Sequence, residues 1–220
     1  MVETVKPRRQ YDSRRRREQA AQTRGDIEAA ADKLFRERGY VGTSMPAIAA
    51  EAGVVVETVY RAFGSKAGLF RAVIESALAG GSKRAETPPA ERPAIRAVIE
   101  EPDPRRKLEL YAATQPGVHG RSSPLYRVLV AAADSDPELR DLLDAVEARR
   151  LHGLGGLASQ LAEGRALRSD LSLEDARDII WTLCSTPVHD LLVRQRGWTA
   201  ETYRHWLAAA LQRELLEEGA

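Results

Sequence analysis

The segment TSMPAIAAEAGVVVETVYRAFGSK, residues 43–66, contains the signals for two short helices joined by a tight turn. Ser44 is a favoured N-cap residue for the first helix. Gly53 follows that helix, because a sharp turn between helices needs a left-handed backbone, which glycine adopts without strain. Val59 and Phe63 then stand four residues apart on one face of the second helix, which leaves a second face to point elsewhere. Two helices in this arrangement fit the major groove of duplex DNA.

Helical patterns flank this segment on both sides. Upstream, DIEAAADKLFRERGY spaces apolar residues as a helical stripe that ends at Gly39, with Tyr40 placed to pack back on Phe35. Downstream, Ser65 and Lys66 precede AGLFRAVIESAL, a further amphipathic helix whose N-terminus carries partial positive charge suited to a phosphate. Three helices therefore support one helix that reads DNA.

Together these residues resemble the tetracycline-repressor-like (TetR) family of regulators over roughly residues 24–78. The matching positions are Leu34, Phe35, Gly39, Tyr40, Thr43, Ser44, Ile48, Ala49, Ala52, Gly53, Val54, Thr58, Val59, Tyr60, Phe63, Ser65 and Lys66. The resemblance implies that phosphates are bound by Thr43, Tyr60 and Lys66. It also implies that bases face the start of the second helix, residues 55–57, together with Arg61. The family usually has Ser or Thr at the position of Val55, so this helix lacks a side-chain N-cap, at a cost of about 1 kcal/mol.

The side chains agree with this division of roles. Hydroxyl and ammonium groups hold phosphate oxygens without reading sequence, so they fix the register of the protein on the duplex. Val55 and Val56 suit thymine methyl groups, Glu57 can accept a hydrogen bond from cytosine, and Arg61 can donate to guanine. Thr58 completes the expected DNA-binding set.

The N-terminal arm, residues 1–21, is strongly basic. Residues 1–24 hold eight basic and three acidic side chains and so carry a net charge of +5. The whole chain carries +1, so the remaining 196 residues carry −4. A basic arm beside a helix-turn-helix favours a clamp on the DNA backbone or minor groove, although a solvated leader without function has the same composition.

Length and composition predict two domains in a cytoplasmic protein. The 220 residues suffice for a helix-turn-helix domain over residues 22–80 and a larger domain over residues 81–220. The single cysteine, Cys184, permits no internal disulfide, and no apolar stretch approaches the length of a membrane span. The Gly- and Pro-rich residues 80–93 are expected to form a loop between the domains.

The second domain shows helical patterns and no sustained alternation, so the fold is predicted to be all-α. We expect helices near residues 92–101, 104–116, 124–134, 137–163, 173–184, 187–196 and 199–217, with breaks that include Gly117 and Gly120.

No motif predicts catalysis, a metal or a cofactor. The glycine cluster at residues 153–158 has the letters of a dinucleotide fingerprint but follows a charged helix rather than a buried strand, so close helix packing or a kink is the better interpretation. The four histidines lack metal-ligand spacing, and Cys184 is expected to be a buried thiol. His189 and Asp190 are adjacent on a helix, where neighbours diverge by about 100° and do not form a catalytic pair.

The second domain is expected to bind an unknown small-molecule effector. Polar tips among apolar helices suit a pocket, and ordinary core packing explains the same residues equally well: Tyr111, Tyr126, Trp181, Cys184 and His189. The resemblance further implies a homodimer held by the last two long helices, to which we assign residues 173–184 and the face formed by Trp206, Ala210 and Leu211. A two-fold dimer would read an inverted repeat in double-stranded DNA.

The sequence therefore predicts a transcriptional regulator, most simply a repressor released by its effector. A constitutive DNA-binding or partner-binding protein without an effector is one alternative, and a helical enzyme is another.

Overall fold

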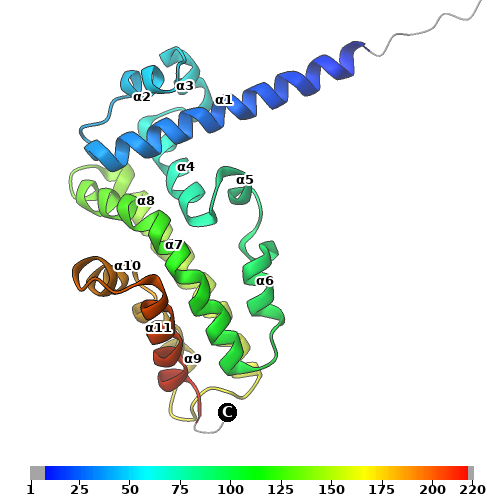
Figure 1. The fold of residues 1–220 in the computed structure, drawn as a ribbon, viewed down its shortest axis with the longest axis vertical. Coiled ribbons are helices and arrows are strands. Elements are labelled where there is room, and N and C mark those ends of the chain that lie inside the picture. The colour runs from blue at the N-terminus through cyan, green and yellow to red at the C-terminus, as the bar shows by residue number, and fades with distance from the viewer. Residues whose placement is uncertain (1–7, 218–220) are drawn as a thin grey trace, which may run out of the picture. The chain divides into compact units, whose positions relative to one another are not determined.

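The computed structural model describes residues 8–217, and its described part is helical apart from one isolated β-bridge between Leu167 and Leu216 (Figure 1). This confirms the prediction of an all-α fold. The helices of the N-terminal part are α1 (Arg8–Arg38), α2 (Met45–Glu51), α3 (Val56–Phe63) and α4 (Lys66–Ala79). The remainder are α5 (Ser82–Ala85), η1 (Pro89–Glu91), α6 (Pro93–Glu100), α7 (Pro104–Ala133), α8 (Pro137–Glu163), α9 (Leu173–Leu183), α10 (Thr186–His189), η2 (Asp190–Gln195) and α11 (Ala200–Leu215).

The chain forms two compact units that meet in sequence between Val73 and Ile74, within α4. The first unit is built around an aromatic cluster. Phe35 packs against Phe70 with 4.6 Å between ring centroids, and Tyr40 stacks on Phe35 at 5.8 Å. This confirms that Tyr40 folds back on Phe35 after the turn at Gly39, whose φ is +70°.

Helix α1 runs from Arg8 to Arg38 and includes most of the basic arm that the sequence suggested as a separate segment. Residues 15–20 are exposed, whereas Ile27, Ala31, Leu34 and Phe35 are buried. The arm is helical because residues 8–38 contain no proline and are rich in Ala, Arg, Gln and Glu, which favour helix. The expected arm residues 1–7 lie outside the described part of the chain.

Helix α7 is continuous, so the expected breaks at Gly117 and Gly120 are wrong. It passes through Pro116 and Pro124 as well. Its inward face is buried along its length, from Leu108 through Ala112 to Leu129. Burial of this face outweighs the local preference of glycine and proline, because most helical stability in proteins comes from packing.

The second unit packs α7 against α8 and α11, and α8 against α9. Its core contains Tyr203, Leu207, Leu211 and Leu215 from α11 with Leu154, Leu157 and Leu161 from α8. The segment expected at 187–196 divides into α10 and the π-helical η2, and Ser185 caps it by accepting a hydrogen bond from the Val188 amide at 3.4 Å. Short helices α5 and η1 occupy the expected loop at 80–93.

Candidate DNA-binding surface and effector pocket

Helix α3 presents one anchored face and one exposed face. Val59 is fully buried and holds the helix on the unit, while Val55 and Tyr60 are 65% and 50% exposed. Glu57 and Arg61 are also exposed, and Val56 and Thr58 are half-buried. Solvent therefore reaches all six predicted residues of α3 and its N-cap. Val59, on the opposite face of the helix, packs into the core of the unit.

The N-terminus of α3 has no side-chain cap, as predicted from Val55. The N-cap of α2, in contrast, is Ser44, which accepts a hydrogen bond from the Ala47 amide at 3.3 Å. Gly53 between the two helices has a φ of +67°, which explains why glycine is required there. The uncapped amides of α3 remain available to an acceptor such as a phosphate oxygen.

Thr43 is placed differently from the expectation that it binds a phosphate. It is 1% exposed, and its hydroxyl lies 2.8 Å from the Gly39 carbonyl and 3.1 Å from the Leu34 carbonyl. Its single proton is donated to these oxygens, which ties the end of α1 to the start of α2. The prediction that the Thr43 side chain contacts DNA is therefore wrong, because the hydroxyl is enclosed within the unit.

Lys66 lies at the start of α4, where its ammonium sits 4.1 Å from the centroid of the Tyr40 ring. Ser65 caps this helix by accepting a hydrogen bond from the Gly68 amide at 3.0 Å. The lysine is thereby oriented beside the positive end of a helix, an arrangement that suits an anion.

A groove of about 450 Å³ separates α1 from α3, and its lining includes Arg16, Thr23, Thr58 and Arg61. Arg24 forms part of the groove and donates a hydrogen bond at 2.8 Å to the carbonyl of Ala62. The guanidinium of Arg24 also lies 4.1 Å from the centroid of the Phe63 ring. Arg24 therefore fixes α3 on α1, and the lining of the groove also includes the basic side chains of Arg16 and Arg61. Sequence reasoning missed this role because the contact joins residues far apart in the chain.

The expected effector-pocket residues form two connected groups in the second unit. Tyr111 and Cys184 are hydrogen-bonded to each other, and burial raises the pKa of the Cys184 thiol to about 12. Trp181 donates its indole N–H to Glu147 at 3.1 Å, and Tyr126 is also hydrogen-bonded to Glu147. Burial and this carboxylate raise the pKa of Tyr126 to about 12. Both groups are consistent with the lining of an effector pocket and equally with ordinary packing of the domain core.

His189, the fifth expected residue, lies beside His119, which stacks on it with 4.7 Å between ring centroids. Tyr203 lies edge-on to His189 at 5.0 Å. His189 Nδ1 also lies 3.4 Å from the Asp190 carboxylate, so these two neighbours in sequence are in contact. The helix type changes between them, from α10 to the π-helical η2, which alters the angle between successive side chains.

Sequence reasoning also missed the charged residues that hold this region together. Arg150 pairs with Glu147 at 3.0 Å and lies 5.0 Å from the centroid of the Trp181 ring. Arg127 pairs with Asp190 at 2.8 Å. The contact between Arg150 and Trp181 links α8 to α9, and the pair of Arg127 with Asp190 links α7 to η2. Charged residues on long amphipathic helices resemble ordinary surface positions, so no sequence signal separates them.

The predicted dimer face on α11 is wrong for two of its three residues. Leu211 is fully buried and Ala210 is 1% exposed, both facing the protomer's own interior. Trp206 is half-buried against Trp198, with 5.9 Å between their ring centroids. The apolar stripe on α11 is thus occupied by packing within one chain, since α11 lies against α7 and α9.

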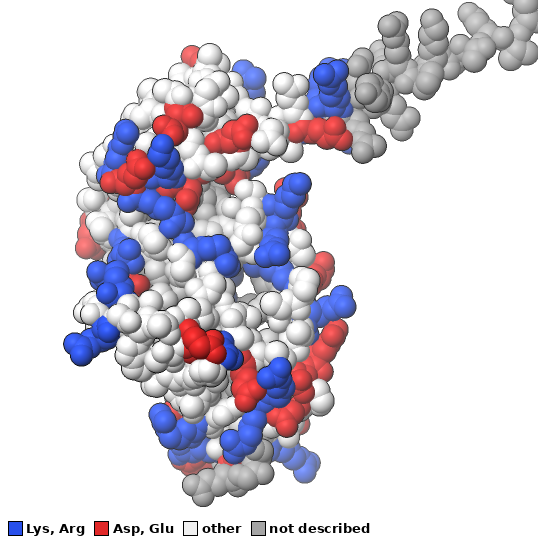
Figure 2. All heavy atoms as spheres, viewed as in Figure 1, with Lys and Arg blue, Asp and Glu red and all other residues white. Residues whose placement is uncertain are grey.

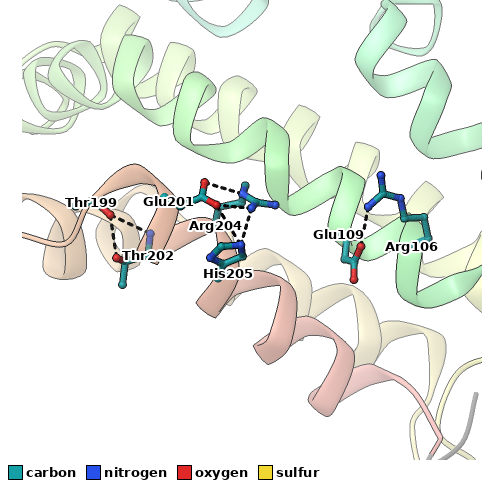
Figure 3. Close-up of polar contacts among 7 residues, drawn as sticks. All are labelled: Arg106, Glu109, Thr199, Glu201, Thr202, Arg204 and His205. Carbon is teal, nitrogen blue, oxygen red and sulfur yellow. Dashed lines mark hydrogen bonds and ion pairs between the residues drawn. The ribbon is translucent and has the colours of Figure 1, made fainter.

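The outward side of α11 is polar (Figure 3). Glu201 accepts from Arg204 at 2.5 Å and lies 3.1 Å from His205 Nε2, and Thr199 caps the helix through the Thr202 amide. Exposed apolar side chains lie instead on α9, where Leu173 is 45% and Trp181 is 36% exposed. On the neighbouring α8, Gly153 and Gly156 have open space where a side chain would stand.

Basic and acidic side chains are mixed across the face of the second unit drawn in Figure 2. None of the described helices is long and apolar enough to cross a membrane. The His, Cys, Asp and Glu side chains of the described residues form no group of three that could hold a metal ion.

The combination of a helix-turn-helix unit with a separate helical unit is that of a two-domain transcriptional regulator. Residues 27–73 match the family model described as "Bacterial regulatory proteins, tetR family". No curated protein matches the chain by sequence.

Solved structures share the fold over both domains. NalD, the secondary repressor of the MexAB-OprM multidrug efflux pump in Pseudomonas aeruginosa, is 24% identical, with 90% of this chain and 99% of that chain covered and a TM-score of 0.68. FadR from Bacillus subtilis in complex with stearoyl-CoA is 18% identical, with 86% and 97% covered and a TM-score of 0.67. The fatty acid degradation regulator FadR from Bacillus halodurans is 18% identical, with 86% and 94% covered and a TM-score of 0.69.

The family match covers the DNA-binding unit, and the fold match covers both units. On these grounds the chain is similar to transcriptional regulators of the TetR family, by sequence over its DNA-binding unit and by fold over both units.

Proposed function

We propose that this protein is a transcriptional repressor that binds an inverted-repeat operator as a homodimer and is released by a small-molecule effector. The observation that carries the proposal is the two-sided helix α3, in which buried Val59 anchors the helix while Glu57, Tyr60 and Arg61 remain exposed. A rigidly supported helix with a polar exposed face is what direct readout of the major groove requires.

Contacts on this surface divide into two kinds. Tyr60 and Lys66 supply a hydroxyl and an ammonium for phosphates, and the exposed side of the α1–α3 groove adds Arg16 beside them. Glu57 and Arg61 supply a carboxylate and a guanidinium for base edges, with Val55 and Val56 for thymine methyl groups. The basic first half of α1 strengthens binding to any duplex by releasing counterions.

Dimerisation on α8 and α9 fits the structure better than the α11 face. Gly153 and Gly156 leave room on α8 for close approach of a second helix, and Leu173 and Trp181 are the exposed apolar side chains of α9. An interface of this kind is isologous, so the two reading helices are related by a two-fold axis and read the same sequence on opposite strands.

An effector bound in the second domain would act by changing the spacing of the two reading helices. The solved relative NalD is named a repressor, and FadR from Bacillus subtilis was solved with stearoyl-CoA, which supports this mode of control here. The ligand then lowers DNA affinity because it binds the DNA-free arrangement more tightly, with reciprocal coupling between the two sites.

The test is selection of genomic fragments from the source organism by the purified protein. We expect a small set of fragments that share an inverted repeat with half-sites about one helical turn or slightly more apart. Adding a cell extract of small molecules, freed of protein, should release the fragments if an effector exists. Specific binding that no extract alters would instead support the constitutive alternative.

A further inference from the structure

Three buried polar atoms of the second unit have no hydrogen-bond partner: His119 Nδ1, the Ser123 hydroxyl and the Tyr203 hydroxyl. The three residues are 4%, 3% and 0% exposed. Buried polar groups in folded proteins are nearly always satisfied, so each exception calls for a reason. A bound water or a bound ligand is the usual one.

The three residues belong to one region, which we call the polar core and define as His119, Ser123, His189 and Tyr203. His119 and Ser123 are four residues apart on α7 and therefore share a face of that helix. The His119 ring lies 6.3 Å from the Tyr203 ring and 4.7 Å from the His189 ring, measured between centroids. Helices α7, α10 and α11 thus bring these side chains together.

The hydrogen bonds of His119 determine which of its nitrogens carries the proton. Its Nε2 lies 3.1 Å from the Cys184 carbonyl, which can only accept, so Nε2 must donate. Burial, followed by the neighbouring His189, lowers the pKa of His119 to about 3, so the ring is neutral. Nδ1 therefore holds a bare lone pair, and the only group it can bind is a donor. The two hydroxyls can either donate or accept.

The cations near the polar core already have partners. Arg150 pairs with Glu147 at 3.0 Å and also donates to the Trp181 carbonyl. Arg127 pairs with Asp190 at 2.8 Å. A carboxylate placed against His119 Nδ1 would meet a lone pair rather than a proton, and it would have to displace one of these acidic partners to gain a cation. The site therefore disfavours anions.

We propose that the polar core binds an uncharged small molecule that donates a hydroxyl or N–H hydrogen bond to His119 Nδ1 and lays a flat apolar body against the rings of His189 and Tyr203. This rests on the proposed function, since the molecule would be the effector. The Tyr203 and Ser123 hydroxyls complete the hydrogen bonding of the donor group. A site built to pair with a hydroxyl discriminates strongly against an analogue that lacks it.

The experiment compares phenol, toluene and benzoate, three flat molecules of similar size that differ in their donor and charge. Each is titrated into the full-length protein labelled with nitrogen-15, and the Nδ1 signal of His119 is followed by long-range proton–nitrogen NMR. We expect phenol to shift this signal in a saturable way, and toluene and benzoate to bind at least about tenfold more weakly, a difference of about 1.4 kcal/mol.

Matched variants distinguish a loss of phenol binding from a loss of folding. Tyr203→Phe and Ser123→Ala remove hydroxyls that lack partners in the fold, so both proteins should fold normally yet bind phenol about five- to tenfold more weakly. Ser122→Ala is the control, because the Ser122 hydroxyl donates to the Val118 carbonyl at 2.9 Å. The control should keep phenol affinity within about twofold.

Three results would overturn the proposal. Toluene binding as tightly as phenol would show that the donor is irrelevant, and tighter binding of benzoate would show an anion site. An Nδ1 signal that none of the probes moves would show that the polar core holds water only. Operator binding is measured on the same samples, with and without phenol. A protein that binds no operator even without phenol contradicts the proposed function, while operator binding by a protein that binds no phenol contradicts only the ligand class.

Discussion

At the scale of single residues, we propose that α3 and the start of α4 carry two sets of side chains, one that fixes register on the phosphates and one that reads bases. Lys66→Ala should weaken binding to operator and random duplex alike and reduce the salt slope by about one, because it removes one phosphate contact. Glu57→Ala should change the preferred base at one position by about 1–3 kcal/mol and leave random duplex unaffected. Titrations at several salt concentrations measure both effects. If Lys66→Ala relaxes sequence specificity and leaves non-specific binding unchanged, Lys66 contacts a base and not a phosphate.

Lys107 is a buried cation that joins three helices. Its ammonium donates to the carbonyls of Val98 and Ile99 at 2.8 and 3.0 Å and to the Gln160 side chain at 2.9 Å, and burial lowers its pKa. Lys107→Met keeps the apolar stem and removes these donors, so the free energy of unfolding should fall by about 1–3 kcal/mol in urea titrations. The exposed Lys83→Met is the control, and equal midpoints for the two variants would contradict the role of Lys107.

The sequence predicted the position of α3 and its exposed face, because a short surface helix is specified by the preceding turn and by its own periodicity. It failed at Thr43, whose hydroxyl is taken up by carbonyls at the end of α1. It also failed at His119, whose neighbours His189 and Tyr203 come from helices distant in the chain. Such contacts depend on tertiary packing, which local patterns do not encode.

At the scale of elements, α1 extends the N-terminal unit with a basic helix. Deleting residues 1–20 removes only exposed side chains among those described, so the fold should remain intact. DNA affinity should fall at low salt, and the difference from the full-length protein should shrink as salt rises, because the segment acts by counterion release. Fluorescence anisotropy with a labelled duplex measures this. Equal affinities at low salt would show that the first half of α1 does not contact DNA.

The helix boundaries show which parts of the fold local sequence patterns predict and which they do not. Caps at Ser44, Ser172 and Thr199 mark the starts of α2, α9 and α11, and the sequence placed these helices closely. Helix α7 was divided in two by the sequence, because Gly and Pro disfavour helix locally. Its long buried face overrides that preference, and only packing against α8 and α11 reveals it.

At the scale of the whole molecule, we propose that the protein dimerises through α8 and α9. Gly156→Arg should improve the helix propensity of α8 by up to about 1 kcal/mol, yet it should block close approach of a second chain and yield monomers. Ala209→Arg is the control, because Ala209 lies on the exposed side of α11. Light scattering should show dimers for the control and monomers for Gly156→Arg. Dimers of Gly156→Arg and monomers of Ala209→Arg would instead show that the interface lies on α11.

The variant Leu211→Asp would not test dimerisation. Leu211 is fully buried in the protomer's own core, so an aspartate there would bury an unpaired charge and unfold the domain. Fold class and family follow from the sequence, but the surface that meets the partner depends on which apolar stripe the protomer itself covers.

The most direct test of a dimeric, sequence-reading regulator is a hydroxyl-radical footprint on a selected genomic fragment, with light scattering of the same complex. The account predicts one dimer per site and protection that is two-fold symmetric, centred on an inverted repeat whose half-sites are about one helical turn or slightly more apart. A monomer that protects a single asymmetric half-site would contradict it.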